Sequence, residues 1–455
     1  MRRTKIVCTL GPATESAEMI RELIRSGMDV ARINFSHGTQ EEHARRIRLV
    51  RQIADEERRV VAVMADLQGP KLRVGEIAGG KVLLQAEAQV VLTARPAPGD
   101  ERQVHFPHPE VIAGLKPDDT ILLDDGALEL RVLEVDGPDV RCRVVIGGEL
   151  LPHKGVSVPG GAPHIPAITD KDRDDLAFAL ERDVDYVAMS FVRQAADVRW
   201  LRELMREAGR EAPIIAKIEK PEAVKNIEAI LEEADGVMVA RGDLGVESPP
   251  EMVPLAQKRL IKLARQAAKP VITATQMLES MIQSPRPTRA EASDVANAIL
   301  DGTDAIMLSG ETAIGRYPVE ALRMMVRIAR STEPALPYDE LVARVSAEEA
   351  VGITDAITQA TCEIAYELRA RAILPSTMSG YTARMISRHR PNTPVLVEEY
   401  HTTDEMIARA EEAVLETGLA QRGDTVVLTA GIPLGGRGKT NMLKVLIVGQ
   451  EAPAE

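Results

Sequence analysis

Two pairs of oppositely charged residues stand at the ends of two apolar runs in the middle of the chain. Lys217 and Glu219 close the first run, and Arg241 and Asp243 follow the second. A helix-like stretch succeeds each run, so the two carboxylates would meet at the same end of two neighbouring parallel strands and repel each other. A divalent cation would relieve that repulsion, and the side chains of Lys217 and Arg241 would hold an anionic substrate beside it. The pattern predicts metal-assisted chemistry on a phosphate or carboxylate compound.

The types of ligand indicate which cation this is. Glu219 and Asp243 offer oxygen atoms and have no His or Cys beside them, which favours a hard cation such as Mg²⁺ or Mn²⁺. Gly242 would permit a close approach of the backbone to a substrate carboxylate. Lys217 is unusual because an otherwise apolar strand rarely holds a strongly hydrated charge. We therefore expect Lys217 to take part in the functional site rather than to be a solvated lysine at the end of a strand.

Short apolar runs alternate with amphipathic stretches of helix length. Strands are expected at 5–10, 30–35, 61–67, 186–192, 213–219, 236–241, 270–275 and 305–310. Helices are expected near 15–26, 40–57, 171–182, 195–208, 222–233, 251–268, 289–301 and 317–331. Nearly continuous apolar strands that alternate with helices favour a parallel sheet buried on both faces. Eight such units predict an α/β fold, a (β/α)8 TIM barrel, with its chemistry at the carboxyl ends of the strands.

The alternation is interrupted once and restarts near the C-terminus. Residues 71–166 alternate apolar and polar positions between Gly and Pro turns, which predicts an inserted antiparallel β-barrel domain that acts as a lid; a rigid decoration is the alternative. The TIM barrel would then comprise residues 1–70 and 167–333. Residues 334–455 show shorter strands and helices, which predict a C-terminal α/β domain, and the strand expected at 394–397 belongs to it.

Composition excludes several classes of function. Lys and Arg number 56 and Asp and Glu 69, so the formal net charge is −13, which disfavours binding of nucleic acid through its phosphates. The three cysteines, Cys8, Cys142 and Cys362, offer neither a disulfide framework nor a zinc spacing. No apolar stretch reaches 18 residues, so no membrane span is expected. We expect a cytoplasmic protein.

Four further strand ends carry polar side chains. They are Arg32, Asn34, Ser36 and His37 after the second strand, Asp66 after the third, Thr275 after the seventh, and Ser309 and Glu311 after the eighth. Each residue alone could cap a turn or a helix, and capping is a specific alternative for Thr275. Arg73, which follows Asp66 closely, is a candidate fork for a phosphate group. Taken together, these residues favour a functional site at the strand ends.

The chain resembles the pyruvate kinase family over about residues 3–450. The motifs that carry the resemblance are Gly11-Pro12, Ala-Arg-Ile-Asn-Phe-Ser-His-Gly at 31–38, Gly69-Pro70, Lys217-Ile218-Glu219, Val-Ala-Arg-Gly-Asp-Leu-Gly at 239–245, Ala-Thr-Gln-Met-Leu-Glu-Ser at 274–280 and Met-Leu-Ser-Gly-Glu-Thr at 307–312. Their order and spacing are highly specific. The resemblance implies a barrel domain, a β lid, a C-terminal regulatory domain and a homotetramer. The implied reaction converts phosphoenolpyruvate and ADP into pyruvate and ATP with Mg²⁺ or Mn²⁺.

The resemblance also implies roles for single residues. Glu219 and Asp243 would hold the metal, and Lys217 and Arg32 would contact the phosphoryl group. The substrate-binding set would be Lys217, Ala240, Arg241, Gly242, Asp243 and Thr275. The enolate would be protonated through a water near Thr275, Ser309 and Glu311, and the donor stays open. The nucleotide would contact Pro12, Asn34, His37, Arg73, Asp125 and Lys154 under the lid.

The chain departs from many relatives beside the third strand. It carries Lys71 where those relatives have Glu, and Leu67-Gln68 where they have Thr and Lys. Those relatives need K⁺ near the positions of Asn34, Ser36 and Asp66. A tethered ammonium can supply the charge that K⁺ brings, so similarity to the K⁺-independent branch implies activity without a monovalent cation. The alternative is that Lys71 is a solvated loop charge.

A possible effector site follows a strand of the C-terminal domain. Its residues would be Ser376, Thr377, Ser379, Gly380, Tyr381 and Thr382, with Arg437 and Lys439 from a Gly-rich loop. Met378 stands where relatives activated by fructose bisphosphate tend to carry a Lys, so that activation is not expected. AMP, a sugar monophosphate, no effector, and plain turn chemistry stay open.

Two other functions are open on the sequence. A barrel lyase or aldolase acting on a 2-oxo acid would also use strand-end Glu and Asp ligands for Mg²⁺, but it would need neither the stretch 32–37 nor a β lid. A non-catalytic relative would be expected to lack at least one of Lys217, Glu219, Asp243 and Thr275, and the chain keeps all four.

Overall fold

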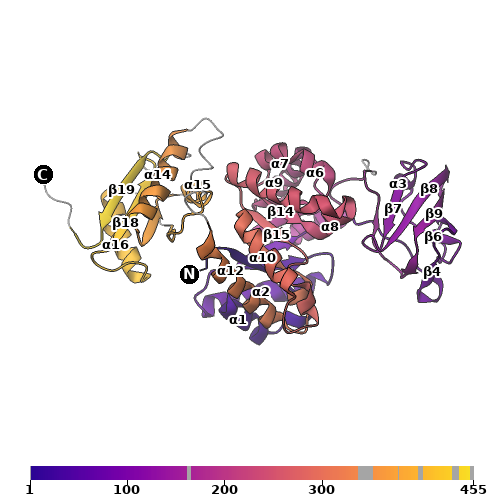
Figure 1. Cartoon of the computed structure of the whole chain (residues 1–455), viewed down its shortest axis with the longest axis horizontal. Helices are drawn as coiled ribbons and strands as arrows, with labels where there is room; N and C mark the ends of the chain where they lie inside the picture. The colour runs from indigo at the N-terminus through magenta and orange to yellow at the C-terminus, as the bar shows by residue number, and fades with distance from the viewer. Residues whose placement is uncertain are drawn as a thin grey trace. The chain divides into compact units, whose positions relative to one another are not determined.

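The computed structural model describes residues 2–160, 165–336, 352–377, 379–397, 403–432 and 440–450. Two compact units divide the chain. One comprises Thr4–Leu263 and Pro270–Ala329, and the other comprises Met1–Arg3, Ala264–Lys269 and Arg330–Glu455. Figure 1 traces these units along the chain. The expected domain boundaries at 70/71, 166/167 and 333/334 stay predictions.

The first unit contains the predicted closed parallel barrel. Its strands are β1 (Lys5–Leu10), β2 (Val30–Asn34), β3 (Ala62–Asp66), β12 (Tyr186–Met189), β13 (Ile214–Ile218), β14 (Gly236–Ala240), β15 (Val271–Ala274) and β16 (Ala305–Leu308), joined in the order β1-β16-β15-β14-β13-β12-β3-β2. Each strand lies inside the run expected for it. The interior is filled by alternate side chains of the strands, among them Val7, Met64, Ile215, Met238 and Met307. The barrel is therefore a packed core, and only its rim is open to substrates.

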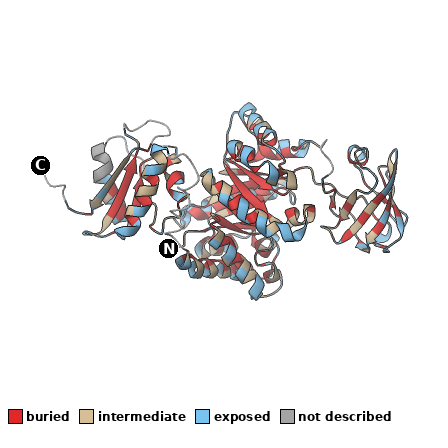
Figure 2. Ribbon diagram, turned by 45° about the horizontal axis from the view of Figure 1, so that its top comes forward, coloured by how far each residue is buried: buried red, intermediate tan, exposed pale blue. Residues whose placement is uncertain are grey.

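Helices surround the barrel strands. They are α1 (Ala17–Ser26), α2 (Gln40–Glu56), α4 (Asp170–Leu180), α5 (Ala195–Glu207), α6 (Pro221–Lys225), α7 (Ile227–Glu233), α8 (Arg241–Glu247), α9 (Val253–Gln266), α10 (Arg289–Asp301), α11 (Gly310–Ala313) and α12 (Pro318–Thr332), with short 3-10 turns at Pro12–Thr14, Pro250–Met252 and Glu279–Ile282. Figure 2 shows their outward faces exposed and the strands buried. Thr39, Thr169 and Thr288 begin α2, α4 and α10 with capping boxes.

Two helical predictions needed correction. The helix expected at 222–233 is divided into α6 and α7 at Asn226. A short helix, α8, starts directly after β14, where no helix was expected. It was missed because its seven residues include two glycines, which are poor helix formers.

The insertion is a curled β-sheet with its own core. Its strands are β4 (Val82–Leu84), β5 (Gln89–Thr93), β6 (Gln103–His105), β7 (Thr120–Leu123), β8 (Leu128–Asp136), β9 (Asp139–Ile146), β10 (Gly148–Leu150) and β11 (Val156–Ser157), accompanied by the helix α3 (Pro109–Ile112) and a 3-10 turn at Ala78–Gly80. Six strands form one sheet in the order β11-β7-β8-β9-β5-β6, and β10 pairs with β4. The sheet is open rather than a closed barrel, and the pairing of β5 with β6 is parallel rather than antiparallel.

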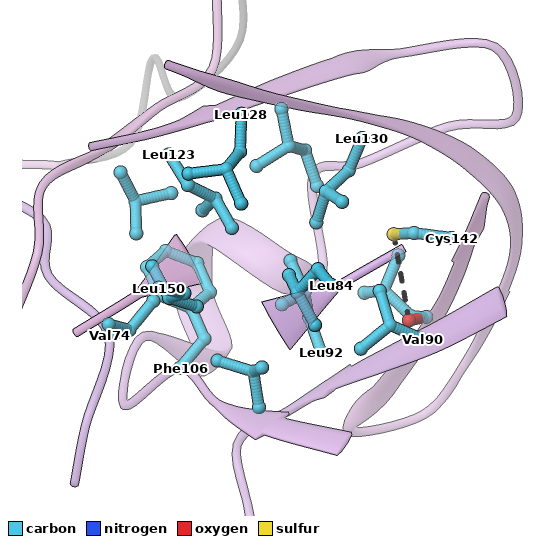
Figure 3. Close-up of a cluster of buried hydrophobic side chains, with 14 of the residues drawn as sticks. Val74, Leu84, Val90, Leu92, Phe106, Leu123, Leu128, Leu130, Cys142 and Leu150 are labelled. Carbon is cyan, nitrogen blue, oxygen red and sulfur yellow. Dashed lines mark hydrogen bonds between the residues drawn. The ribbon is translucent and has the colours of Figure 1, made fainter. Parts of the chain in front are cut away.

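Leucines and valines of both strand groups fill the core of the insertion. Figure 3 shows Leu84, Leu92, Leu130 and Leu150 pointing into it, with Phe106 and Cys142 beside them. All three cysteines of the chain are buried. Burial raises the pKa of Cys142 to about 12, so this thiol is inert packing rather than a nucleophile.

The second unit contains a small α/β fold. Its elements are the 3-10 turn Glu333–Ala335, α14 (Ile353–Glu367), β17 (Ala372–Pro375), α15 (Tyr381–Ser387), α16 (Thr403–Glu416), β18 (Thr425–Ala430) and β19 (Met442–Ile447). The strands form one sheet in which β17 is parallel and β19 antiparallel to β18. The strand expected at 394–397 is reduced to a single bridge between Ile373 and Val395. Nowhere in the described ranges is a helix long and apolar enough to span a bilayer.

Candidate active site

The rim of the barrel gathers charged side chains from separate strands around Asp66. The Lys217 ammonium lies 3.2 Å from Asp66 Oδ1 and 2.9 Å from Glu219 Oε1. Arg32 donates from Nε to Asp66 Oδ2 at 2.5 Å and from a terminal nitrogen to Thr9 Oγ1 at 2.9 Å. All of these side chains are nearly buried. Two cations are thus held at fixed positions by two carboxylates, which preorganises positive charge for an anion.

One member of this cluster was not predicted. Ser190, just beyond β12, accepts a hydrogen bond from Lys217 Nζ at 2.7 Å and donates to the Leu67 carbonyl oxygen at 2.7 Å. The next residue, Phe191, donates its backbone N–H to Glu219 Oε2 at 2.7 Å. The available signal was a serine following the apolar residues of the fourth strand. Ser190 fixes the direction of the lysine side chain.

Neighbouring charges determine the protonation of the buried cluster. Burial opposes the charged form of Lys217, but Asp66 and Glu219 outweigh it and raise the pKa of Lys217 above its usual range. Burial likewise opposes ionisation of Asp66, yet the charges of Arg32 and Lys217 bring the pKa of Asp66 below its ordinary value. Lys217 and Asp66 are therefore both charged at neutral pH.

Glu219 behaves in the opposite way. Its pKa is raised to about 7. Burial is the main cause and the charge of Asp243 adds to it, whereas the charge of Lys217 acts in the opposite direction. A carboxylate held in this state gains from a nearby cation. Two carboxylates without soft ligands fit Mg²⁺ or Mn²⁺, which take few protein ligands and leave positions for substrate oxygens. Over the described residues, no group of three or more His, Cys, Asp or Glu side chains is arranged to hold a metal.

Arg241 is fully engaged within the protein. Its guanidinium donates to the carbonyl oxygens of Ala274 (3.2 Å) and Thr275 (2.7 Å). The other bonds reach Gln257 Oε1 at 3.3 Å, Asp294 Oδ1 at 2.7 Å and Met277 Sδ at 2.8 Å. A guanidinium has five N–H donors, so these contacts leave none for a substrate. The Arg241 side chain was expected to hold an anionic substrate, whereas this geometry fits orientation of its neighbours.

Thr275 has a strained backbone. Its φ angle is +68°, and that of Gln276 is +54°. A β-branched residue in the left-handed region costs on the order of 1–3 kcal/mol. The Thr275 hydroxyl accepts the backbone N–H of Gly242 at 2.7 Å and donates to the Ala274 carbonyl oxygen at 2.7 Å. The hydroxyl therefore joins the end of β15 to the first turn of α8 instead of capping a helix of its own.

Ser309 and Glu311 lie at the end of β16. Both Glu311 oxygens accept backbone N–H groups, Oε1 from Leu278 at 3.0 Å and Oε2 from Ser309 at 2.7 Å. Burial raises the pKa of Glu311. The buried Ser309 hydroxyl has no hydrogen-bond partner within the part of the chain that the structure describes. Glu311 thus holds two loops together, whereas the Ser309 hydroxyl accepts and donates no hydrogen bond within the described residues.

The loop after β2 has a compact polar turn. Asn34 Oδ1 accepts the backbone N–H of Ser36 at 3.1 Å. Burial lowers the pKa of His37, and the positive charges of Lys71, Arg73 and Arg32 lower it further. His37 is therefore neutral at pH 7, and three cations act on this one loop.

The insertion brings further candidates toward the barrel. Arg73 donates to the His153 carbonyl oxygen at 2.7 Å, and Lys154 pairs with Asp124 at 2.8 Å. Asp125, beside Asp124, lines a cavity together with Lys71, Asp243 and Glu247. Ser157 of the insertion donates to Glu247 of α8 at 2.7 Å. This cavity therefore holds residues of both the insertion and the barrel.

The remaining candidates lie in turns. Pro12 begins a 3-10 turn after β1, and the preceding Gly11 packs so closely on Ala313 that a Cβ would lie 2.6 Å from its carbonyl oxygen. In the second unit, Gly380 has φ +71° and begins α15, and Thr382 Oγ1 lies 2.9 Å from Thr440 Oγ1. Ser376, Thr377, Ser379 and Tyr381 occupy the same turn, whereas Arg437 and Lys439 lie outside the described residues.

The fold and site define a class: a (β/α)8-barrel protein with an inserted β-sheet and a rim of paired carboxylates and cations shaped for an anionic substrate. The chain belongs to the pyruvate kinase family. The family model "Pyruvate kinase, barrel domain" matches residues 1–322, and "Pyruvate kinase, alpha/beta domain" matches 355–399 and 393–446. The resemblance inferred from the motifs is thereby confirmed.

Individual relatives agree with this membership. A pyruvate kinase of Geobacillus stearothermophilus is 45% identical over 98% of this chain and 80% of its own length. One of Staphylococcus haemolyticus is 44% identical over 99% of this chain and 81% of its own length. A crystal structure of a pyruvate kinase from Cryptosporidium parvum superposes with a TM-score of 0.92 at 36% identity, covering 98% of this chain and 96% of that one.

Proposed function

We propose that this protein transfers the phosphoryl group of phosphoenolpyruvate to ADP and releases pyruvate and ATP. The observation that carries the proposal is the Lys217 ammonium, fixed between Asp66 and Glu219 at the barrel rim. Phosphoryl transfer passes through a loose transition state whose charge is spread over the phosphoryl oxygens, so its catalysis consists mainly of positioning and fixed charge. A buried, permanently protonated lysine with an arginine beside it supplies both.

Each side chain has a role in this proposal. Lys217 follows the phosphoryl group and stabilises the enolate left behind, and Arg32 contacts the phosphoryl oxygens. Ala240, which ends β14, and Arg241, Gly242 and Asp243 in the first turn of α8 seat the substrate carboxylate beside Thr275. A water near Thr275 and Ser309 protonates the enolate carbon, and Glu311 holds the loops around it. Pro12, Asn34, His37, Arg73, Asp125 and Lys154 surround the nucleotide.

The metal requirement follows from the carboxylate pair. Glu219 and Asp243 would hold Mg²⁺ or Mn²⁺, because burial of Glu219 and the nearby charge of Asp243 disfavour ionisation of Glu219 in the metal-free site. The ion, when bound, supplies positive charge beside the substrate oxygens. The Phe191 backbone N–H fixes one Glu219 oxygen at 2.7 Å, and Lys217 holds the other at 2.9 Å, so the direction of the carboxylate is set.

We propose further that the reaction needs no K⁺. Lys71 supports this, because its charge acts on His37, in the same loop as Asn34 and Ser36, where relatives bind the ion. Turnover should therefore be the same in a K⁺-free tetramethylammonium buffer before and after addition of KCl. A rise of many-fold on addition of KCl would overturn this proposal and leave the phosphoryl-transfer proposal intact.

The remaining assignments belong to the same proposal. The chain would comprise barrel segments 1–70 and 167–333, a lid at 71–166 and a regulatory domain at 334–455. It would form a homotetramer in the cytoplasm. The turn at 376–382 would receive an effector phosphate, with AMP and sugar monophosphates as the candidates to titrate.

A coupled assay tests the main proposal. Pyruvate formation, followed through lactate dehydrogenase and NADH, should require phosphoenolpyruvate, ADP and Mg²⁺ together. A barrel lyase or aldolase acting on a 2-oxo acid would form product without ADP. Release of pyruvate from phosphoenolpyruvate alone, or no release under any of these conditions, would refute the proposal.

A further inference from the structure

Asp294, on α10, is the charged partner of Arg241. Its Oδ1 atom lies 2.7 Å from a terminal nitrogen of the guanidinium. The Arg241 side chain is only 11% exposed, whereas that of Asp294 is 38% exposed. The other acceptors of the guanidinium are carbonyl oxygens, an amide oxygen and a thioether, none of which carries charge. Asp294 is therefore the counter-ion that permits the guanidinium to stay nearly buried.

The guanidinium in turn holds the strained end of β15. It binds the carbonyl oxygens of Ala274 and Thr275. These two carbonyl groups come directly before and after the Cα atom of Thr275, whose backbone is left-handed. The Thr275 hydroxyl donates to the same Ala274 carbonyl and accepts the N–H of Gly242. Because Gly242 follows Arg241 in the chain, these bonds close a ring that fixes the first turn of α8 against β15.

We propose that Asp294 is a positioning residue for the substrate carboxylate. This inference rests on the proposed function, in which the α8 turn and Thr275 seat that carboxylate. Asp294 does not line the cavity that holds Asp243 and Glu247. It acts through Arg241. The Asp294 carboxylate fixes the plane of the guanidinium, and the guanidinium in turn fixes the carbonyl oxygens of Ala274 and Thr275 and, through them, the Thr275 hydroxyl. Loss of the Asp294 charge would loosen the bonds that join Arg241, Thr275 and Gly242, where the substrate carboxylate binds. The residues that surround the nucleotide would not be affected.

A purely structural role for Asp294 makes a different prediction. If the ion pair only fastened α10, its removal would affect folding, or would change the KM values for both substrates together. A positioning role instead confines the effect to phosphoenolpyruvate and makes it depend on Thr275. A double-mutant cycle between the two residues separates these cases.

The experiment compares Asp294→Asn with Glu233→Gln in the full-length protein. Glu233 is a matched control because it also forms one partly exposed ion pair, 3.0 Å from Arg199, with a side chain that is 29% exposed. It ends α7 just before β14, at the opposite end of that strand from Arg241. Both variants are also made in a Thr275→Ala background, and Asp294→Glu tests whether restored charge restores function.

We expect Asp294→Asn to raise the KM for phosphoenolpyruvate by about tenfold, the size expected for a lost charge-assisted contact. The KM for ADP should stay within about twofold, and Glu233→Gln should match the wild type. Asp294→Glu should return the KM toward the wild-type value. In the Thr275→Ala background, Asp294→Asn should add little.

Three results would overturn the inference: kinetics of Asp294→Asn that match those of Glu233→Gln, a parallel rise in both KM values, or the full effect persisting without the Thr275 hydroxyl. If Asp294→Asn does not fold, the same comparison applies to Asp294→Ser, which also removes the charge. Lack of pyruvate formation by the wild type would instead refute the proposed function.

Discussion

Metal binding by Glu219 and Asp243 should depend steeply on pH near neutrality. Burial and the charge of Asp243 raise the pKa of Glu219 to about 7 from an ordinary 4.5, although Lys217 opposes the shift. A metal binds the carboxylate and not the carboxylic acid, so its apparent affinity follows the ionised fraction of Glu219. With a pKa of about 7, that fraction rises from roughly one in eleven at pH 6 to ten in eleven at pH 8. Affinity should therefore rise about tenfold.

The same shift affects the stability of the metal-free protein. Because the folded pKa of Glu219 exceeds the unfolded one, the unfolded chain loses this proton at lower pH than the folded chain does. The contribution of Glu219 to the free energy of unfolding is therefore fully present below pH 4.5 and is lost as the pH rises through about 7. Bound metal should prevent this decrease in the free energy of unfolding as the pH rises.

The assay is calorimetric titration of the substrate-free protein with Mn²⁺ at pH 6, 7 and 8. Asp243→Asn serves as the comparison: it should bind Mn²⁺ more weakly and shift the midpoint of the pH dependence downward, because the Asp243 charge raises the pKa of Glu219. Affinity of the wild type that is flat within about twofold over this range would refute the reasoning, because a carboxyl of ordinary pKa is already ionised at pH 6.

Three further predictions concern Lys71, Lys217 and Asp172. Lys71→Glu should lower turnover at least about tenfold in tetramethylammonium buffer, with recovery on adding KCl; unchanged turnover would show that Lys71 does not replace the ion. Lys217→Met should lower kcat by roughly 10²–10³ while Mn²⁺ still binds at pH 8; a kcat near the wild-type value would exclude its role. Asp172→Asn should lower the free energy of unfolding by about 1–3 kcal/mol in urea, because the buried Asp172 carboxylate accepts the backbone N–H groups of Gly69 and Thr169 at 2.9 Å each. Asp170→Asn, at an exposed position on the same helix, is its control, and equal losses would contradict the explanation.

The barrel was predictable because its strands are buried on both faces. Runs such as 214–218 are apolar at nearly every position, so Lys217 stands out within its strand and leads directly to the site. The open insertion and the division of the helix at 222–233 were less predictable, because they depend on pairing and turn geometry that alternation does not encode.

The finer geometry of the site depends on contacts between distant positions. Arg241 is bound by Gln257 and Asp294, which lie 16 and 53 residues away in the chain. The left-handed backbone of Thr275 contradicts the preference of a β-branched residue and is supported by those tertiary bonds. Ser190 could have been found from its place at a strand end, whereas Asp294 carries no local signal.

The central claim is that the Lys217 cluster transfers a phosphoryl group between two small anions. The most direct test is ³¹P NMR of phosphoenolpyruvate mixed with ADP, Mg²⁺ and the protein in K⁺-free buffer. The phosphoenolpyruvate resonance should be replaced by the γ-phosphate resonance of ATP, and Lys217→Met should slow this conversion at least about a hundredfold. Appearance of inorganic phosphate in place of ATP, or equal rates for the two proteins, would contradict it.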